Sequence, residues 1–376
     1  MFLRNSKLRS RERKRNIVVI KSMSSGVNTR KVKNPKKGDR DNNSTLLFSL
    51  PDDVVFAEMV QRPSRRNRSP YVADVLLLDG GKGKNNQREA IAHVPSLDMG
   101  GKCIPGTRLV LKVARDKKGN AVGKDAVSAK YGTPKCEFIT QLVRVDDTSL
   151  GYKNACWIGA HPSLGERIAE QLIKGNHLGS DFPKVKSYRR EVVNPGGANM
   201  RADFVVEHED PSLPLRVVEV KTVADTDYSA SLKLPDRMKC LYVNNDTKPY
   251  RRAAIFPWGQ SKQKGPKGEI VVSARAIKHV MELTQLVVDG RKEDDLSKKY
   301  DATVLFVVVR NDTDIFRPNH EACPSFTKYL KDAHDAGVQI LSKKISWGEG
   351  DENFGKCYDN KMLEVVWPVS ITSNNK

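Results

Sequence analysis

Two short segments, residues 201–206 and 215–222, constrain the fold of this 376-residue chain more than any other feature. Both are rich in Val and Phe and are bounded by turn-forming residues, so each is predicted to be a β-strand. Side chains alternate along a strand, so Glu219 and Lys221 project from the same face of the second segment. An acid or a Lys on an apolar strand is costly to bury unless it has a partner or a function.

Asp203, on the first segment, can supply a second carboxylate beside Glu219. Carboxylate oxygens are the ligands that hard divalent cations such as Mg²⁺ prefer, and a Lys beside them can orient a water or hold a phosphate. The pattern therefore indicates metal-assisted phosphodiester hydrolysis, with Asp203 and Glu219 as metal ligands and Lys221 as a catalytic residue. The alternative is that Glu219 and Lys221 form an ordinary ion pair on the solvent face of an edge strand.

The positive charge of the chain is concentrated near its N-terminus. The formal net charge is +20, and residues 1–45 contribute +11 of it, from 14 Lys or Arg against three acids. A basic, acid-poor leader of this kind, which we expect to be disordered, is typical of an organelle transit peptide and predicts a plastid or a mitochondrion. A nuclear-import or nucleic-acid-binding arm has the same composition, so the nucleus or the cytoplasm is the alternative location.

Cysteine spacing and hydropathy argue against several classes of protein. The six cysteines are scattered without a C-x-x-C pair, so neither a zinc site nor a disulfide framework is indicated. No apolar run approaches the length of a membrane span, and we expect no membrane partner. A glycine-rich phosphate loop of the Walker type is also missing, which gives little support to an enzyme acting on a phosphorylated sugar.

Alternating apolar segments between residues 46 and 148 predict the first folded domain. Turn-forming stretches separate these segments, and their number and length favour an OB-type β-barrel, a fold that commonly binds single-stranded nucleic acid. The first long turn carries arginines followed by an aromatic residue, which can contact phosphates and stack on a base. A solvated loop with the aromatic ring in the core is the alternative. The turn residues are Arg62, Arg65, Arg66, Arg68 and Tyr71, and the predicted strands are residues 54–60, 71–78, 90–94, 107–114 and 137–145.

From residue 149 to residue 345 the pattern changes to mixed helices and strands. Ser163-Leu164-Gly165-Glu166 is a capping box, which predicts a helix that ends at Gly175 and carries Glu166 and Glu170 on its polar side. The segment 225–270 is long and polar for a connection, so it is predicted to be an insertion, and residues 346–376 are predicted to be a C-terminal extension. The other expected elements are strands at 188–193, 303–310 and 338–341 and helices at 273–288 and 325–336.

This order of elements resembles the PD-(D/E)XK nuclease fold, although Ala202 replaces the Pro of its motif. More specifically, residues 54–345 resemble the sugar fermentation stimulation protein family, which pairs an N-terminal OB-like domain with a PD-(D/E)XK-like C-terminal domain. After His93-Val94-Pro95 the family has an Asn and a Gly where this chain has Ser96 and Asp98. The matching stretches include Tyr71-Val72-Ala73-Asp74-Val75, Arg190-Glu191-Val192, Arg201-Ala202-Asp203-Phe204, Val218-Glu219-Val220-Lys221-Thr222, Arg275 and Lys278-His279.

The resemblance implies an α+β multidomain protein that binds DNA non-specifically and carries Mg²⁺-dependent nuclease chemistry in its second domain. It implies Glu191 or Glu170 as an outer or alternate ligand, since the helix Glu of the family falls on Glu170. Arg275, Lys278 and His279, on one face of the second helix, would then contact the scissile backbone. The alternative is a non-catalytic DNA-binding regulator of sugar metabolism that keeps the fold; RNA is a second candidate partner.

Overall fold

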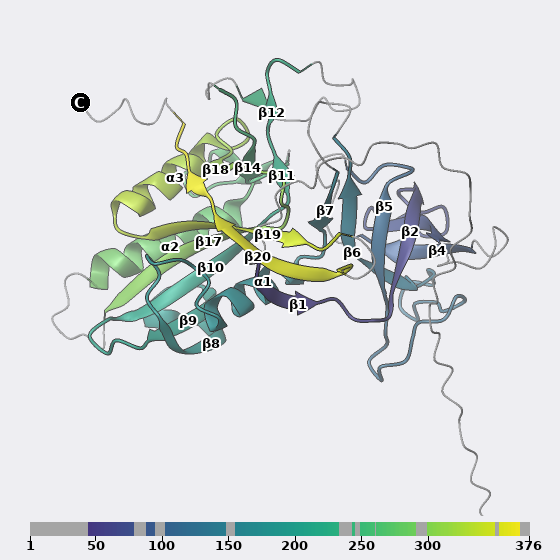
Figure 1. The fold of residues 1–376 in the computed structure, drawn as a ribbon, viewed down its shortest axis with the longest axis horizontal. Coiled ribbons are helices and arrows are strands. Elements are labelled where there is room, and N and C mark those ends of the chain that lie inside the picture. The colour runs from purple at the N-terminus through teal and green to yellow at the C-terminus, as the bar shows by residue number, and fades with distance from the viewer. Residues whose placement is uncertain are drawn as a thin grey trace, which may run out of the picture.

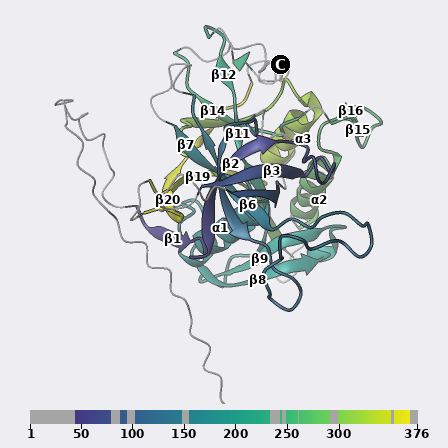
Figure 2. The same cartoon turned by 90° about the vertical axis from the view of Figure 1, so that its right-hand side faces the viewer.

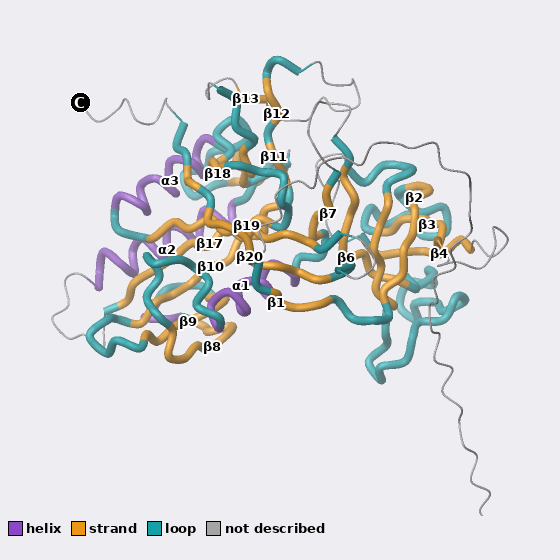
Figure 3. The backbone as a smooth tube through the Cα atoms, viewed as in Figure 1, coloured by secondary structure: helices purple, strands orange, loops and turns teal. Residues whose placement is uncertain are grey.

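The computed structural model describes residues 44–78, 88–94, 102–147, 155–232, 243–244, 249–259, 261–290, 299–349 and 353–368. A barrel of strands and a larger α/β domain lie side by side (Figure 1). The α-helices of the described ranges all belong to the α/β domain, and the barrel consists of strands and loops (Figure 3). The predicted fold class, an OB-like barrel followed by an α/β domain, is therefore confirmed. Residues 1–43 of the predicted leader lie outside the described residues.

The barrel is closed, because the two strands at the ends of its spatial order pair with each other. The strands follow the order β4-β3-β2-β5-β6, and β6 also pairs with β4 through Ala92 and Phe138. Closure removes the free edges that would otherwise invite pairing with another chain. Each strand lies within two residues of its predicted bounds, because alternation of apolar side chains fixed which residues face inward. The strands are β2 (Val54–Gln61), β3 (Val72–Leu78), β4 (Arg88–His93), β5 (Arg108–Val113) and β6 (Phe138–Val145).

A seven-stranded mixed sheet forms the centre of the α/β domain, in the order β1-β20-β19-β17-β10-β9-β8. Its central strand, β17, runs parallel to β10 and β19, whereas β9 runs antiparallel to both of its neighbours, β8 and β10. Figure 2 views the molecule from the barrel end, with β2 and β3 in front of this sheet. The strands are β1 (Leu46–Ser49), β8 (Val185–Val193), β9 (Arg201–His208), β10 (Leu215–Val223), β17 (Tyr300–Val308), β19 (Gln339–Trp347) and β20 (Lys356–Met362).

Helices cover both faces of this sheet, as the apolar run of β17 predicts. Leu305 and Val307 pack with α1 (Ser163–Lys174), while Val304 and Phe306 pack with α2 (Ala274–Gly290) and α3 (Pro324–Asp335). The α1 layer and the interior of the barrel belong to one continuous hydrophobic cluster, so the two domains share a core. None of the helices within the described ranges is long and apolar enough to cross a bilayer.

The segment predicted to be an insertion contributes a strand to the fold. β14 (Ala253–Phe256) pairs with β11 (Asp225–Thr226) and with β18 (Ile315–Pro318), which in turn pairs with β21 (Glu364–Val365). The ring of Phe256 packs in the core against Phe306 and Phe326, so β14 belongs to the domain. Short pairings and one 3₁₀ turn complete the described elements: β12 (Tyr228–Ser229), β13 (Val243–Asn244), β15 (Gln263–Lys264), β16 (Ile270–Val271) and η3 (Pro195–Gly197).

The termini cross the predicted domain boundaries. β1, which we assigned to the barrel, pairs with β20, and β20, which we assigned to a C-terminal extension, pairs with β19. Both strands therefore belong to the α/β sheet. Neither segment was predicted to be a strand, and the local pattern of a segment does not say which distant strand it pairs with.

β7 (Cys156–Gly159) connects the two domains. It pairs with β6 of the barrel. The backbone N–H of Gly159 donates to the carbonyl of Val309, the residue that directly follows β17, at 3.0 Å. The chain then enters α1 at Ser163 as predicted. The capping box does not form, because Ser163 Oγ contacts Nδ1 of His161 at 2.6 Å and no side chain caps the helix.

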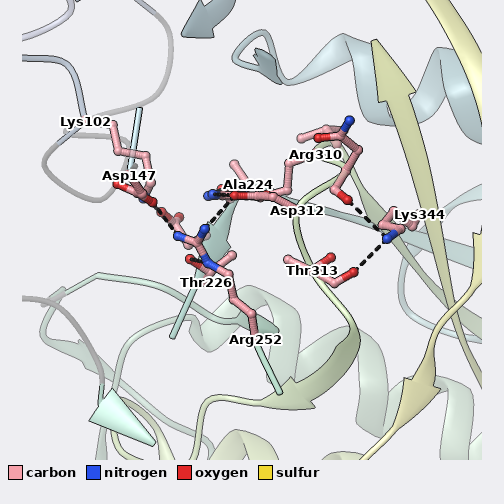
Figure 4. A network of polar contacts seen from close by, with 12 residues as sticks. Lys102, Asp147, Ala224, Thr226, Arg252, Arg310, Asp312, Thr313 and Lys344 are labelled. Atoms are coloured by element: carbon pink, nitrogen blue, oxygen red, sulfur yellow. Dashed lines mark hydrogen bonds and ion pairs between the residues drawn. The ribbon is translucent and has the colours of Figure 1, made fainter. Parts of the chain in front are cut away.

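A buried polar network also joins the two domains (Figure 4). From the barrel side, Lys102 Nζ lies 2.8 Å from Oδ1 of Asp225, and Asp147 pairs with the guanidinium of Arg252. The side chains of Asp147 and Arg252 are 5% and 2% exposed. Removing one partner of such a pair leaves an uncompensated buried charge, at a cost of about 3–5 kcal/mol.

The same network continues into the α/β domain. The second branch of the Arg252 guanidinium contacts Asp312 at 2.7 Å, and Asp312 also binds the fully buried Arg310. Burial by itself raises the pKa of Asp312, but the charges of Arg310 and Arg252 outweigh it and hold that pKa well below its ordinary value. Arg310 donates in turn to the carbonyl of Ala224, just beyond β10. The end of β10 is thereby fixed relative to the barrel.

Candidate functional site

The acidic residues of β9 and β10 lie next to each other across the pairing of these strands. Val218 is paired with Phe204, and the antiparallel register carried one step further places Glu219 opposite Asp203. Instead of a further backbone pair, Oδ2 of Asp203 accepts a hydrogen bond from the backbone N–H of Val220 at 2.6 Å. The sheet therefore brings the two predicted carboxylates together where β9 and β10 part.

Glu219 is buried under α2, with its side chain only 3% exposed. Oε1 contacts Nδ1 of His279 at 2.6 Å and Nζ of Lys221, whereas Oε2 is buried and has no hydrogen-bond partner among the described residues. Burial raises the pKa of Glu219, but the hydrogen bond from His279 and the charge of Lys221 outweigh it, so the pKa lies below its ordinary value. Glu219 is thus an ionised carboxylate with one oxygen unused, which is an arrangement that a cation would stabilise.

Asp203 is partly buried, and other carboxylates lie close to it. Burial raises the pKa of Asp203 to about 7, with the charges of Glu219 and Glu166 acting in the same direction, against the opposing effects of the Val220 N–H and Lys221. Such a carboxyl is costly to ionise without a nearby cation. Strongly shifted pKa values of this kind cluster at functional sites.

Three carboxylates from different elements converge around Asp203. One oxygen each of Glu166 on α1, Glu191 on β8 and Asp203 on β9 lie within 4.8 Å of one another. An all-carboxylate set provides the hard oxygen ligands that Mg²⁺ and Ca²⁺ take. Together with the unused oxygen of Glu219, these donors fit a divalent cation. Glu219 itself is not a member of the three-residue group, although we predicted it as a direct ligand.

Glu191 lies near the C-terminal end of β8 in a strained conformation. Arg190 is paired with Phe204 and Val192 with Ala202, so Glu191 lies opposite Asp203. Its φ of 52° is in the left-handed region, which costs about 1–3 kcal/mol for a residue other than Gly. Its carboxylate also binds Nε of Arg201 at 2.6 Å. Backbone strain of this kind persists only where the surrounding structure holds the residue in place, and it is common at functional sites.

Glu166, and not Glu170, is the α1 residue that joins this cluster, which corrects our assignment. Glu170 accepts hydrogen bonds from the hydroxyl of Tyr188 at 3.2 Å and from Arg190 at 2.8 Å. A Cβ on Gly165 would overlap Oγ1 of Thr222, so the absence of a side chain there lets the first turn of α1 touch the end of β10. That contact places Glu166 beside Asp203. In the sequence, a Gly inside the predicted helix was the signal that α1 approaches a neighbouring element closely at this point.

The three predicted basic residues of α2 do not share one outer face. Arg275 and Lys278 are exposed, but His279 is buried and turned toward Glu219. His279 lies next to the buried residues Ile277 and Val280 of α2. Its contact with the buried carboxylate of Glu219 keeps its side chain inside the protein. His279 therefore belongs to the carboxylate site and is unavailable as an exposed backbone contact.

The arginine-containing turn of the barrel is held in one conformation by hydrogen bonds. The backbone N–H of Arg65 donates to Oδ2 of Asp74 at 2.9 Å, and Nε of Arg62 donates to the carbonyl of Pro70 at 2.7 Å. Arg65, Arg66 and Arg68 are exposed. Tyr71 is 39% exposed, so of the two alternatives for this residue the core position is excluded.

Comparisons with known proteins agree with this architecture. A family model described as "Sugar fermentation stimulation protein RE domain" matches residues 271–350, from the strand before α2 to the end of β19. A sugar fermentation stimulation protein homolog of Methanothermobacter thermautotrophicus is 32% identical over 323 residues, which are 86% of this chain and 98% of that protein. The homolog of Maricaulis maris is 25% identical over 296 residues, 78% of this chain and 91% of its own length.

A solved structure shares the fold. Pyrococcus furiosus SfsA, solved in complex with Ca²⁺, superposes with a TM-score of 0.52 at 16% identity, and the match covers 86% of this chain and 99% of that one. At this level of identity the likeness supports the arrangement of barrel and α/β domain. It does not extend to individual site residues.

Proposed function

The chain belongs to the sugar fermentation stimulation protein family, and from that premise we propose that it binds nucleic acid and hydrolyses phosphodiester bonds with Mg²⁺ in its second domain. The observation that carries the proposal is the convergence of Glu166, Glu191 and Asp203, from α1, β8 and β9, beside Lys221. Carboxylates and an amine at one place are the groups that metal-assisted phosphodiester hydrolysis uses.

Glu166, Glu191 and Asp203 would hold the cation, with Glu219 contributing through its unused oxygen. When bound, Mg²⁺ neutralises charge on the phosphate and lowers the pKa of a coordinated water. The solved relative from Pyrococcus furiosus is described as a complex with Ca²⁺, a hard cation that takes the same oxygen ligands, which supports this choice of donors.

Lys221 and His279 position the reacting groups. The ammonium of Lys221 has three donors, of which one is used by Glu219, so it can hold a phosphate oxygen or orient a water. His279 holds Oε1 of Glu219 in place and leaves Oε2 for the site. Arg275 and Lys278, exposed on α2, and the arginine turn of the barrel provide positive charge for a nucleic-acid backbone.

Incubation of linear duplex and single-stranded DNA with and without Mg²⁺ tests the proposal. We expect the parent protein to cleave DNA only with Mg²⁺, and Asp203→Ala to abolish cleavage while salt-sensitive binding persists. Asp332→Ala is the matched control, because Asp332 lies on the exposed face of α3 in an ion pair with Lys328. Equal cleavage by the Asp203→Ala variant and the parent would remove the catalytic role.

A non-catalytic DNA-binding regulator with the same fold is the second candidate. Two observations favour it: Lys221 is paired with Glu219, and Ser96 and Asp98 replace an Asn and a Gly of the family. Binding that falls steeply with salt, without cleavage under any metal, would support this candidate over the hydrolase.

A further inference from the structure

A cavity of about 350 Å³ lies beside the end of β10, where the chain passes from β7 into α1. Its walls come from the end of β7, the residues that precede α1, the end of β10 and the strand β14. The cavity contains none of the proposed metal ligands, and the function proposed above makes no use of it. Lining residues that matter here are His161, Thr222, Asp225, Phe256 and Trp258.

The cavity and the carboxylate site share a wall. Thr222, which lines the cavity, directly follows Lys221 on β10, and its hydroxyl touches Gly165, which directly precedes Glu166 on α1. Lys221 and Thr222 are consecutive on β10, so their side chains project from opposite faces of that strand. The cavity therefore adjoins the backbone of the residues that carry Lys221 and Glu166.

The lining of the cavity suits a planar aromatic ligand. Phe256 and Trp258 both contribute to it, and Phe256 is braced from behind by Phe306 and Phe326. The indole N–H of Trp258 is buried and has no hydrogen-bond partner among the described residues. A buried donor without a partner is costly.

Aromatic and basic side chains of the barrel lead toward this cavity. The ring of the exposed Tyr71 lies 6.3 Å from that of His93, at the end of β4. His93 is paired with Ile139 on β6, and Gln141, two residues further on that strand, accepts a hydrogen bond from Ala160 at the cavity wall. Burial and the neighbouring charges of His93 and Lys112 lower the pKa of His161. Tyr71, His93 and His161 thus mark one continuous path from the barrel to the cavity.

We propose that the cavity receives one unpaired base of a single-stranded nucleic acid that runs along Tyr71 and His93, with the adjoining phosphate at Lys221. This inference rests on the function proposed above and names its substrate class. Stacking of a base on an aromatic side chain stabilises a complex by about 1–3 kcal/mol. Bases inside a duplex are stacked and paired, and their extrusion costs a few kcal/mol, so the cavity selects single strands or unpaired ends.

Binding of a fluorescein-labelled 20-mer oligothymidylate to the full chain in EDTA tests the inference, because no cleavage interferes without metal. Trp258→Ala is expected to weaken this binding about 5- to 150-fold and to leave the affinity for a duplex of the same length unchanged. Trp258→Phe keeps a stacking ring and should restore most of the loss. The matched control is Trp367→Ala, which removes a partly buried Trp that packs on α3 against His334 and Lys331.

A second measurement needs no variant of the protein. A single abasic site is moved along the oligonucleotide, and we expect the parent to lose affinity at one position but not at its neighbours. Uniform affinity across the abasic series, or an equal loss of single-strand and duplex binding in Trp258→Ala, would overturn the inference.

The outcome is separable from that of the hydrolase proposal. Unchanged strand binding by Trp258→Ala, with cleavage that depends on Asp203, would remove the base cavity and leave the hydrolase. A strand-selective loss in Trp258→Ala, in a protein that cleaves nothing, would leave the cavity and remove the hydrolase.

Discussion

Nδ1 of His279 lies 2.6 Å from Oε1 of Glu219, and both side chains are more than nine-tenths buried. The contact joins α2 to β10 and explains why a His lies among the buried residues of this amphipathic helix. It also leaves Oε2 of Glu219 without a partner among the described residues. His279 is therefore a positioning residue that aims a carboxylate at the site formed by Asp203 and its neighbours.

The first prediction concerns this positioning. We expect His279→Ala to lower the apparent affinity for Mg²⁺ or Ca²⁺ about 10- to 100-fold, because loss of an orienting partner has that effect at metal sites. The metal-dependent increase in melting temperature measures this affinity without requiring cleavage. His334→Ala, on the exposed end of α3, is the control. A His279→Ala variant whose metal titration matches that of the parent would show that the contact is purely structural.

The second prediction concerns the cost of ionising Asp203. Its pKa of about 7 in the folded chain lies above the ordinary value near 4. Between these values the folded chain holds a proton that the unfolded chain releases, so this residue makes stability fall as pH rises from 4 to 7. Asp203→Asn cannot ionise, and its amide oxygen can still accept the Val220 N–H.

We therefore expect Asp203→Asn to stabilise the metal-free protein at pH 8 by roughly 2–4 kcal/mol, and to give little gain near pH 4. Thermal melts in EDTA at both pH values measure the difference. Addition of Mg²⁺ should reverse the order, since only the parent then gains from the cation. A variant that is equally stabilised at both pH values would show that ionisation of Asp203 is not the cause.

Much of the site could be predicted because it depends on local pattern. Alternation in residues 201–206 and 215–222 placed Asp203 and Glu219 on strands, and the structure sets them opposite each other. The apolar run of β17 likewise predicted a strand covered on both faces. In each case the local pattern of apolar residues indicates which faces of the strand are buried.

The misses share a different cause, because they depend on contacts between distant segments. Glu166 rather than Glu170 reaches Asp203 because Gly165 lets α1 touch Thr222, a contact that no helical wheel contains. His279 faces inward because Glu219, 60 residues away in sequence, is buried there. β1 leaves the barrel region to pair with β20 for the same reason. Periodicity fixes a residue's face but not its distant partner.

The third prediction tests the network that fixes the barrel to the α/β domain. Asp147→Ala leaves the buried guanidinium of Arg252 without one of its carboxylates, so we expect a loss of about 3–5 kcal/mol in the free energy of unfolding. Denaturant titration followed by circular dichroism measures it. Asp332→Ala removes an exposed ion pair and should cost less than about 1 kcal/mol. Similar losses of unfolding free energy in both variants would mean that the buried polar network does not hold the domains together.

The fourth prediction tests whether the arginine turn of the barrel contacts a nucleic-acid backbone. Each phosphate contact with a single strand releases counterions and steepens the fall of affinity with salt by about 0.7 in the logarithmic slope. Simultaneous replacement of Arg65, Arg66 and Arg68 by Ala should therefore reduce the slope for single-stranded DNA by about 2. Replacing the exposed Lys117, Lys118 and Lys124 by Ala removes the same charge from another turn of the barrel. Salt slopes reduced equally in the two triple variants would mean that net charge alone, and not the arginine turn, governs binding. A reduction confined to the arginine variant would place the single-stranded DNA on the path that leads past Tyr71.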